Sequence, residues 1–263
     1  MTSGPHPLSL LLRGFCVDWI AGAQEQAASK FLAPTYTAHV GGVTFAGLEQ
    51  YIPAVLGQLH TYPGLSLTVH DVLLGDEGIA MVFSEHGATT DGVAAAWRGV
   101  GLFAWDGNQL IENWTEEDYY ARRRQLVSKN PDAVPTPATA PWATPWMEAD
   151  EEHRSTVVAW LTSGLMESTP TVTLDDGLET STLLNQDTIT ISHSVSAGSR
   201  VAFQASVEGT FLGGLDIVDA AIGTPATMGV SGLVSVQSDG SISGQVVRDR
   251  LGLRRALSIA GRN

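Results

Sequence analysis

The stretch "WRGVGLFAWDGNQLIENWTEEDYYARRRQL" (residues 97–126) decides the fold class of this chain. It begins as a β-rich segment, turns at Asp106-Gly107, returns through a second β-rich segment and ends in a basic run with helical character. An Asp-Gly pair between two such segments is a strong signal for a β-hairpin. Two further β-rich segments, 65–74 and 78–87, precede it. We therefore predict an antiparallel meander that closes with a helix.

The residues before the meander have the periodicity of helices. Apolar side chains recur at Leu11, Phe15, Trp19 and Ile20. They predict an amphipathic helix over residues 10–30, followed by a short extended piece at 36–40 and a second helix at 46–59. Helices first and a meander afterwards predict an α+β fold, in which helices pack on one face of a curved antiparallel sheet. Such a sheet leaves a concave pocket between itself and the leading helix.

A proline-rich segment divides the chain. Residues 127–150 hold five of the twelve prolines, none of which suits a helix interior or a central strand. We interpret the segment as a linker. Its two tryptophans, Trp142 and Trp146, argue against a purely flexible tether, because large rings usually find a surface to cover.

Four blocks of sequence recur in the same order on the two sides of the linker. "VDWIAGAQ" at 17 matches "VAWLTSGL" at 158, and "IAMVFSEHG" at 79 matches "VAFQASVEG" at 201. Common order and similar spacing predict a tandem duplication. The predicted organisation is two cone-shaped domains: a first domain over 1–127, a linker over 128–150 and a second, degenerate domain over 151–263.

Charge and composition exclude several classes of function. A net charge of −14 argues against a nucleic-acid partner, which would require a basic surface. No apolar run reaches the 18 residues of a membrane span, so no membrane partner is expected. Cys16 is the only cysteine, which fits a reducing compartment, and we expect a cytoplasmic protein. The seven histidines lack metal-ligand spacing, so no metal site is predicted.

The first copy resembles the SnoaL-like polyketide cyclases of the nuclear-transport-factor-2-like superfamily. The resemblance covers residues 12–126 and rests on Tyr36 and His39, Gly47-Leu48-Glu49, Gly87, Asp106-Gly107, and the closing Glu112, Trp114 and Asp118. The second copy keeps the strand pattern but reads "VVRDRLGLRRAL" where the closing motif belongs. The resemblance implies a cone-shaped fold and acid–base chemistry without a cofactor on a bulky apolar small molecule. It also implies that the two domains pair within the chain as a pseudo-dimer, and leaves pairing of two chains open.

Three residues of the first copy are candidate proton carriers. By the resemblance, His39 lies where the ketosteroid-isomerase branch keeps its base; the alternative is a core or rim histidine hydrogen-bonded to backbone. Alternation along 78–87 puts Ile79, Met81, Phe83 and Glu85 on one face. Glu85 is then a functional acid or a paired structural acid of the pocket, or else a solvated residue at a strand end. Asp118 is either an acid at the pocket mouth or the cap of the helix that follows. Glu116 and Glu117 are expected at the start of that helix.

The second copy offers Asp175 and Glu208, which fall opposite His39 and His86 when the blocks are matched. They form an acid–base pair in one reading, and in the other Asp175 belongs to a turn. The predicted substrate contacts are Trp19, Tyr36, Trp97, Arg98 and Trp114. Arg98 either clamps a substrate carboxylate or oxyanion, or pairs with a surface acid. Trp114 either plugs the open end of the sheet or touches substrate.

Two hypotheses about function follow. The first is a cofactor-independent cyclase, isomerase, dehydratase or epoxide hydrolase that acts on a polyketide, terpenoid or steroid-like metabolite. The second is a non-catalytic module that holds an apolar small molecule or binds another protein.

Overall fold

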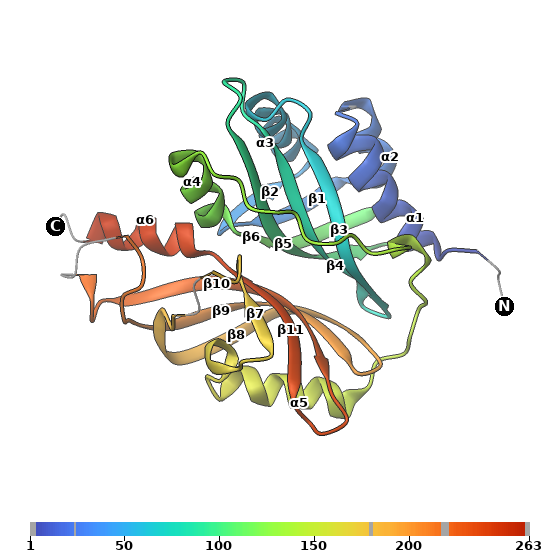
Figure 1. Ribbon diagram of the computed structural model, residues 1–263. Helices are drawn as coiled ribbons and strands as arrows, with labels where there is room; N and C mark the ends of the chain where they lie inside the picture. Colours follow the sequence, from blue (N-terminus) through green and yellow to red (C-terminus); the bar gives the residue numbers. More distant parts are fainter. Residues whose placement is uncertain (1–3, 24, 179–180, 217–220, 261–263) are drawn as a thin grey trace.

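In the computed structural model the chain forms two β-sheets with helices packed on each, and the fold class is α+β as predicted (Figure 1). The structure describes residues 4–23, 25–178, 181–216 and 221–260. Within these ranges no helix is both long and apolar enough to cross a bilayer.

The first sheet has six strands in the order β2-β1-β6-β5-β4-β3. Its strands are β1 (Leu32–Val40), β2 (Val43–Ala46), β3 (Ser66–Gly75), β4 (Gly78–Ala88), β5 (Ala94–Trp105) and β6 (Leu110–Glu117). Neighbouring strands are antiparallel except β1 and β6, which are parallel. The Asp106-Gly107 hairpin joins β5 to β6, and Gly107 has a φ of 97°, which a glycine adopts without strain.

The helices of the first domain differ in detail from the prediction. The expected helix over 10–30 is broken into α1 (Pro7–Gly14), a π-helical stretch (Phe15–Ala21), a 3-10 turn (Glu25–Ala27) and α2 (Ala28–Phe31). They are followed by α3 (Leu48–Thr61) and, after the sheet, α4 (Tyr119–Ser128). The break matters little for packing, because Phe15, Trp19 and Ile20 are buried against the sheet as their spacing predicted.

The second sheet has five strands in the order β7-β11-β10-β9-β8. The elements of this half are α5 (Glu151–Thr162), a 3-10 turn (Met166–Ser168), β7 (Val172–Leu174), β8 (Leu184–Ala197), β9 (Arg200–Phe211), β10 (Pro225–Val236), β11 (Ile242–Arg248) and α6 (Arg250–Ala260). As in the first sheet, the short first strand pairs in parallel with the last one. The described part of this half has no counterpart of β2 or α3.

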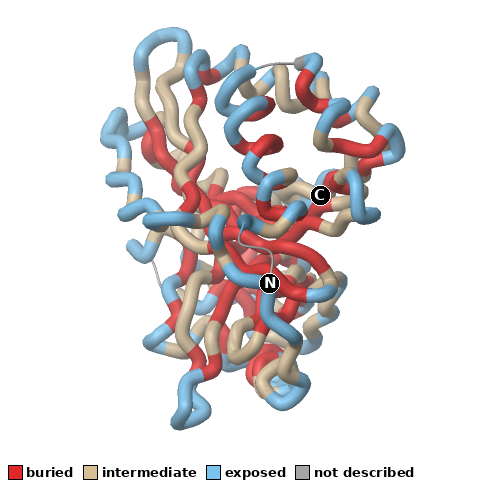
Figure 2. Tube along the Cα trace, turned by 90° about the vertical axis from the view of Figure 1, so that its right-hand side faces the viewer, coloured by how far each residue is buried: buried red, intermediate tan, exposed pale blue. Residues whose placement is uncertain are grey.

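The two sheets pack face to face, with α1–α3 on the far side of one and α5 on the far side of the other (Figure 1). The apolar cluster between them contains Leu73, Ala80, Val82, Val100 and Leu102 of the first sheet and Val195, Ala197, Ala202, Leu233 and Val247 of the second. Strand β4 is buried on both faces, which explains its continuous apolar sequence. In Figure 2 the buried segments gather where the domains meet.

The proline-rich segment follows the first domain closely. The Ala138 amide donates to the Val69 carbonyl (2.9 Å) and the Met147 amide to the Leu74 carbonyl (3.2 Å). The Trp142 ring packs on the core of the first domain, whereas Trp146 is half-exposed. One of the two tryptophans therefore covers an apolar surface, as the composition of the segment predicted.

Candidate active site

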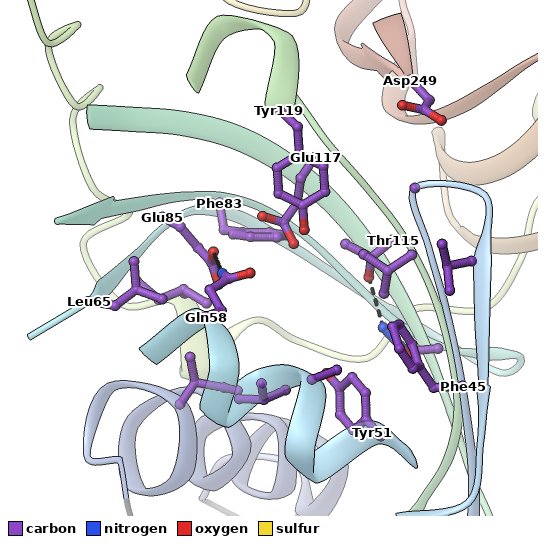
Figure 3. A pocket seen from close by; sticks show the side chains of 18 of the residues that line it. Phe45, Tyr51, Gln58, Leu65, Phe83, Glu85, Thr115, Glu117, Tyr119 and Asp249 are labelled. Atoms are coloured by element: carbon purple, nitrogen blue, oxygen red, sulfur yellow. Dashed lines mark hydrogen bonds between the residues drawn. The ribbon is translucent and has the colours of Figure 1, made fainter. Parts of the chain in front are cut away.

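A cavity of about 270 Å³ lies between the first sheet and α3 (Figure 3). Its wall is mostly apolar, with Phe15, Ile20, Val55, Leu65, Met81, Phe83 and Phe103 among the lining residues. Helix α6 of the second domain closes one side through Leu251 and Gly252. The predicted pocket is thus present in the first domain, and both domains contribute to its wall.

Two glutamates on neighbouring parts of the sheet point into this cavity, Glu85 from β4 and Glu117 from the end of β6. Both are buried. Side chains alternate along a strand, so Glu85 shares its face with Met81 and Phe83, and Glu117 shares its face with residues 113 and 115. Glu85 therefore lies on the face predicted for it. Glu117 was expected at a helix start but is a strand residue.

Hydrogen bonds join the two carboxyl groups and indicate which of them holds a proton. Glu85 and Glu117 are hydrogen-bonded to each other, which requires one of them to be protonated. Glu117 accepts the indole N–H of Trp97 (2.6 Å) and the hydroxyl of Tyr119. Glu85 accepts the amide N–H of Gln58. We therefore assign the proton to Glu85, whose carboxyl O–H donates a hydrogen bond to Glu117.

Electrostatics agree with this assignment. Burial, the negative charge of Glu117 and the hydrogen bond to it raise the pKa of Glu85 well above its usual range, although Arg122 and Gln58 oppose the shift. Burial and the same two carboxyl groups raise the pKa of Tyr119, which keeps its hydroxyl a donor. The Arg122 guanidinium lies over the rings of Trp97 (4.8 Å) and Tyr119 (4.2 Å). One cation thus stacks on both rings that hold Glu117.

His39 lies outside the cavity, on the opposite face of β1 from Tyr36 and Val40. Its Nε2 is 2.8 Å from Glu112 Oε1 and its Nδ1 is 3.0 Å from Thr44 Oγ1. The imidazole stacks on the Trp114 ring, with centroids 5.8 Å apart.

Trp114 does not reach the cavity either. The Trp114 ring also stacks on His193 of the second domain, with centroids 3.8 Å apart, so Trp114 belongs to the contact between the sheets. Arg98 also faces the second domain, where its Nη1 donates to Gln245 Oε1 (2.9 Å). Trp19 and Tyr36 are core residues of the first domain, and both rings contact Tyr51 in the cavity wall. Trp97 alone of the predicted substrate contacts touches a carboxyl group of the cavity.

Asp118 caps helix α4 and is buried at the domain contact. Its Oδ1 accepts the Ala121 amide (3.0 Å), and its Oδ2 accepts from Arg250 of the second domain (2.5 Å). Asp175 is also fully buried, and its carboxylate accepts the backbone amide and guanidinium of Arg248. Glu208 is exposed on β9. None of these three acids lines the cavity of the first domain.

The second domain lacks the carboxyl pair. Counting along the paired strands from the helix that follows each sheet places Val207 at the position of Glu85 and Arg248 at the position of Glu117. Val207 is part of the apolar core. The buried Arg248 is neutralised by Glu167 and Asp175.

The same register tests the match between the sequence blocks. Glu208 falls at the position of His86, as the blocks predicted. Asp175 falls at the position of Gly41, two residues beyond His39. The pairing of β7 with β11 differs by two residues from the alignment of the sequence blocks. The predicted equivalence of Asp175 and His39 is therefore corrected by the strand pairing.

Sequence reasoning missed Glu117, Gln58 and Tyr119. The alternation that placed Glu85 also runs through 110–117, and extending β6 by three residues would have put Glu117 on the inner face. Gln58 and Tyr119 carried no comparable signal, because each joins the site only through tertiary packing. Among the described residues, no group of three or more His, Cys, Asp or Glu side chains is arranged to hold a metal ion.

Solved structures with a similar fold match part of this chain. No family model and no curated protein matches the chain. Among solved structures, a candidate SnoaL-like polyketide cyclase from Jannaschia sp. CCS1 is 17% identical, with a TM-score of 0.43, over 48% of this chain and 96% of that one. A candidate polyketide cyclase from Acidithiobacillus ferrooxidans is 19% identical, with a TM-score of 0.42, over 49% and 99%.

A third similar structure is a hypothetical protein with a ketosteroid isomerase-like fold from Catenulispora acidiphila. It is 14% identical, with a TM-score of 0.37, over 40% of this chain and 82% of that one. The resemblance is one of fold. These three matches span 48%, 49% and 40% of the chain.

Proposed function

We propose that the chain is a cofactor-independent acid–base enzyme that acts on a bulky apolar small molecule in the cavity of the first domain. The observation that carries the proposal is the buried Glu85–Glu117 pair in an otherwise apolar wall. A carboxyl group that is neutral at working pH is a general acid, and its partner retains the matching negative charge. Glu85 gives its proton to a carbonyl, hydroxyl or epoxide oxygen, and Glu117 is the group that can accept one.

The second domain is proposed to support this site without catalysing the reaction. Its Val207 and Arg248 replace the two carboxyl groups. Its sheet buries the outer face of the first sheet, so we infer that the two domains act as an internal pseudo-dimer. This arrangement fits isomerisation, cyclisation, dehydration or epoxide opening equally well, because each of these reactions needs a proton donor beside an apolar substrate.

The experiment is to assay the full chain against bicyclic ketones and bicyclic epoxides. NMR would follow deuterium uptake beside the carbonyl, and chromatography would follow diol formation. In Glu85→Gln the amide keeps a donor toward Glu117 but has no acidic proton, so turnover should fall at least about 100-fold while the fold is retained. Glu49→Gln, an exposed glutamate at the start of α3, is the matched control.

The histidine site makes the opposite prediction. His39→Ala should keep turnover if the Glu85–Glu117 pair is the acid–base centre, because His39 faces away from the cavity. Loss of turnover in His39→Ala, with Glu85→Gln unaffected, would contradict the proposal.

A further inference from the structure

The cavity has two chemically different ends. Figure 3 shows Glu85 and Glu117 together on one side and Asp249, from the second domain, on the other. Burial raises the pKa of Asp249, while the Gly252 amide and the charge of Arg255 oppose that shift. Because the charge of Arg255 acts on Asp249, both residues belong to the end of the cavity that the second domain forms.

Arg255 is the only basic side chain among the described residues that line the cavity. It is exposed on α6, and among the described residues it has no hydrogen bond or ion pair. Other arginines of the same helix are occupied: Arg250 pairs with Asp118, and Arg254 pairs with Asp216. Within the part of the chain that the structure describes, Arg255 thus presents guanidinium donors without a hydrogen-bond partner at the mouth of an apolar cavity.

The helix that carries Arg255 is held in place. Arg250, at its first residue, is buried and bridges to Asp118 of the first domain at 2.5 Å. Leu251 lines the cavity, and Leu253 and Leu257 are buried in the second domain. Arg255 is therefore anchored at a defined place relative to the carboxyl pair.

We propose that Arg255 recognises an anionic group, such as a carboxylate, on the end of the substrate that lies away from the reacting centre. The inference rests on the proposed function in taking this cavity as the substrate site. An anion at the inner end would meet the charge of Glu117, so the arginine orients an apolar acid with its anionic group at the mouth. The second domain then determines specificity at a site whose proposed acid–base pair belongs to the first.

The test is equilibrium binding of two ligands that do not react, 1-naphthylacetic acid and 1-naphthylacetamide, measured by calorimetry on the full chain. The acid should bind the unmodified chain about tenfold more tightly than the amide, the value of one charge-assisted contact. In Arg255→Ala that ratio should fall to about one while the affinity for the amide is unchanged. Arg255→Lys should retain part of the preference.

Arg13→Ala is the matched control, because it removes one exposed cation of α1 that does not line the cavity. It should keep the full ratio. Equal affinity for acid and amide in the unmodified chain, no binding of either ligand, an equal loss for both ligands in Arg255→Ala, or loss of the ratio in Arg13→Ala would each overturn the proposal. Glu85→Gln should keep the ratio, so a failed assignment of the acid is distinguishable from a failed assignment of the anion site.

Discussion

The proposed acid–base chemistry of the cavity depends on a single proton on Glu85. The carboxyl group lies among apolar side chains and donates to a partner, Glu117, that two other donors, the Trp97 indole and the Tyr119 hydroxyl, already hold. Burial and the charge of Glu117 raise the pKa of Glu85, so the neutral form is assigned to Glu85. The acid and its charged partner thus differ in their surroundings and not in their chemical type.

The pH dependence of Glu85 follows from the direction of its pKa shift. The pKa is raised in the folded chain above its ordinary value of 4.5, so the folded state binds the proton more tightly than the unfolded one. The contribution of Glu85 to stability is complete below that value and is lost as pH rises through the raised pKa. Turnover should fall over the same pH range, because Glu85 ionises and no longer has a proton to give.

Denaturant unfolding at a series of pH values checks this prediction. In the unmodified chain the free energy of unfolding should decline as pH rises and Glu85 ionises. In Glu85→Gln that decline should be smaller, because glutamine does not titrate. A variant whose stability falls with pH in parallel with the unmodified chain would show that Glu85 is already ionised.

At the scale of elements, the two sheets approach so closely at one point that only a glycine fits there. An added Cβ at Gly75, the last residue of β3, would lie 2.1 Å from the carbonyl oxygen of Ser196 on β8. The backbones of the two domains approach each other closely there, and a side chain would force them apart. By contrast, Gly57 in α3 has no atom within 4 Å of an added Cβ.

This difference predicts that alanine at the two glycines changes the free energy of unfolding in opposite directions. Gly75→Ala should destabilise the chain by about 1–3 kcal/mol, because overpacking forces backbone shifts. Gly57→Ala should stabilise it by about 0.5–1 kcal/mol, because alanine loses less entropy in a helix. Chemical denaturation measures both, and a neutral Gly75→Ala would mean that the sheets adjust without cost.

At the scale of the whole molecule, buried charges tie the domains together. Arg250 contacts Asp118 of the first domain and also lies 3.2 Å from Asp175 and 3.3 Å from Asp176 of the second. Removing one partner of such a network leaves the remaining charges buried without compensation. The network lies next to α6, so it also positions the wall of the cavity.

Arg250→Met should cost about 3–5 kcal/mol in the free energy of unfolding. Arg254→Met, which breaks a more exposed contact with Asp216 on the same helix, should cost less than about 1 kcal/mol. Thermal and denaturant unfolding of the two variants provide the comparison. Equal losses would show that the buried network has no special role.

The sequence alone determined the fold class, because alternation, helical periodicity and the Asp106-Gly107 turn are local properties of the chain. Alternation likewise placed Glu85 on the cavity face. Only the tertiary structure decided which groups meet Glu85. Gln58 and Glu117 are separated from it along the chain by 27 and 32 residues, and the packing of α3 and the pairing of β5 with β6 bring them together. The same packing placed Arg255 at the cavity mouth, since the position of α6 depends on contacts between domains that no local pattern encodes.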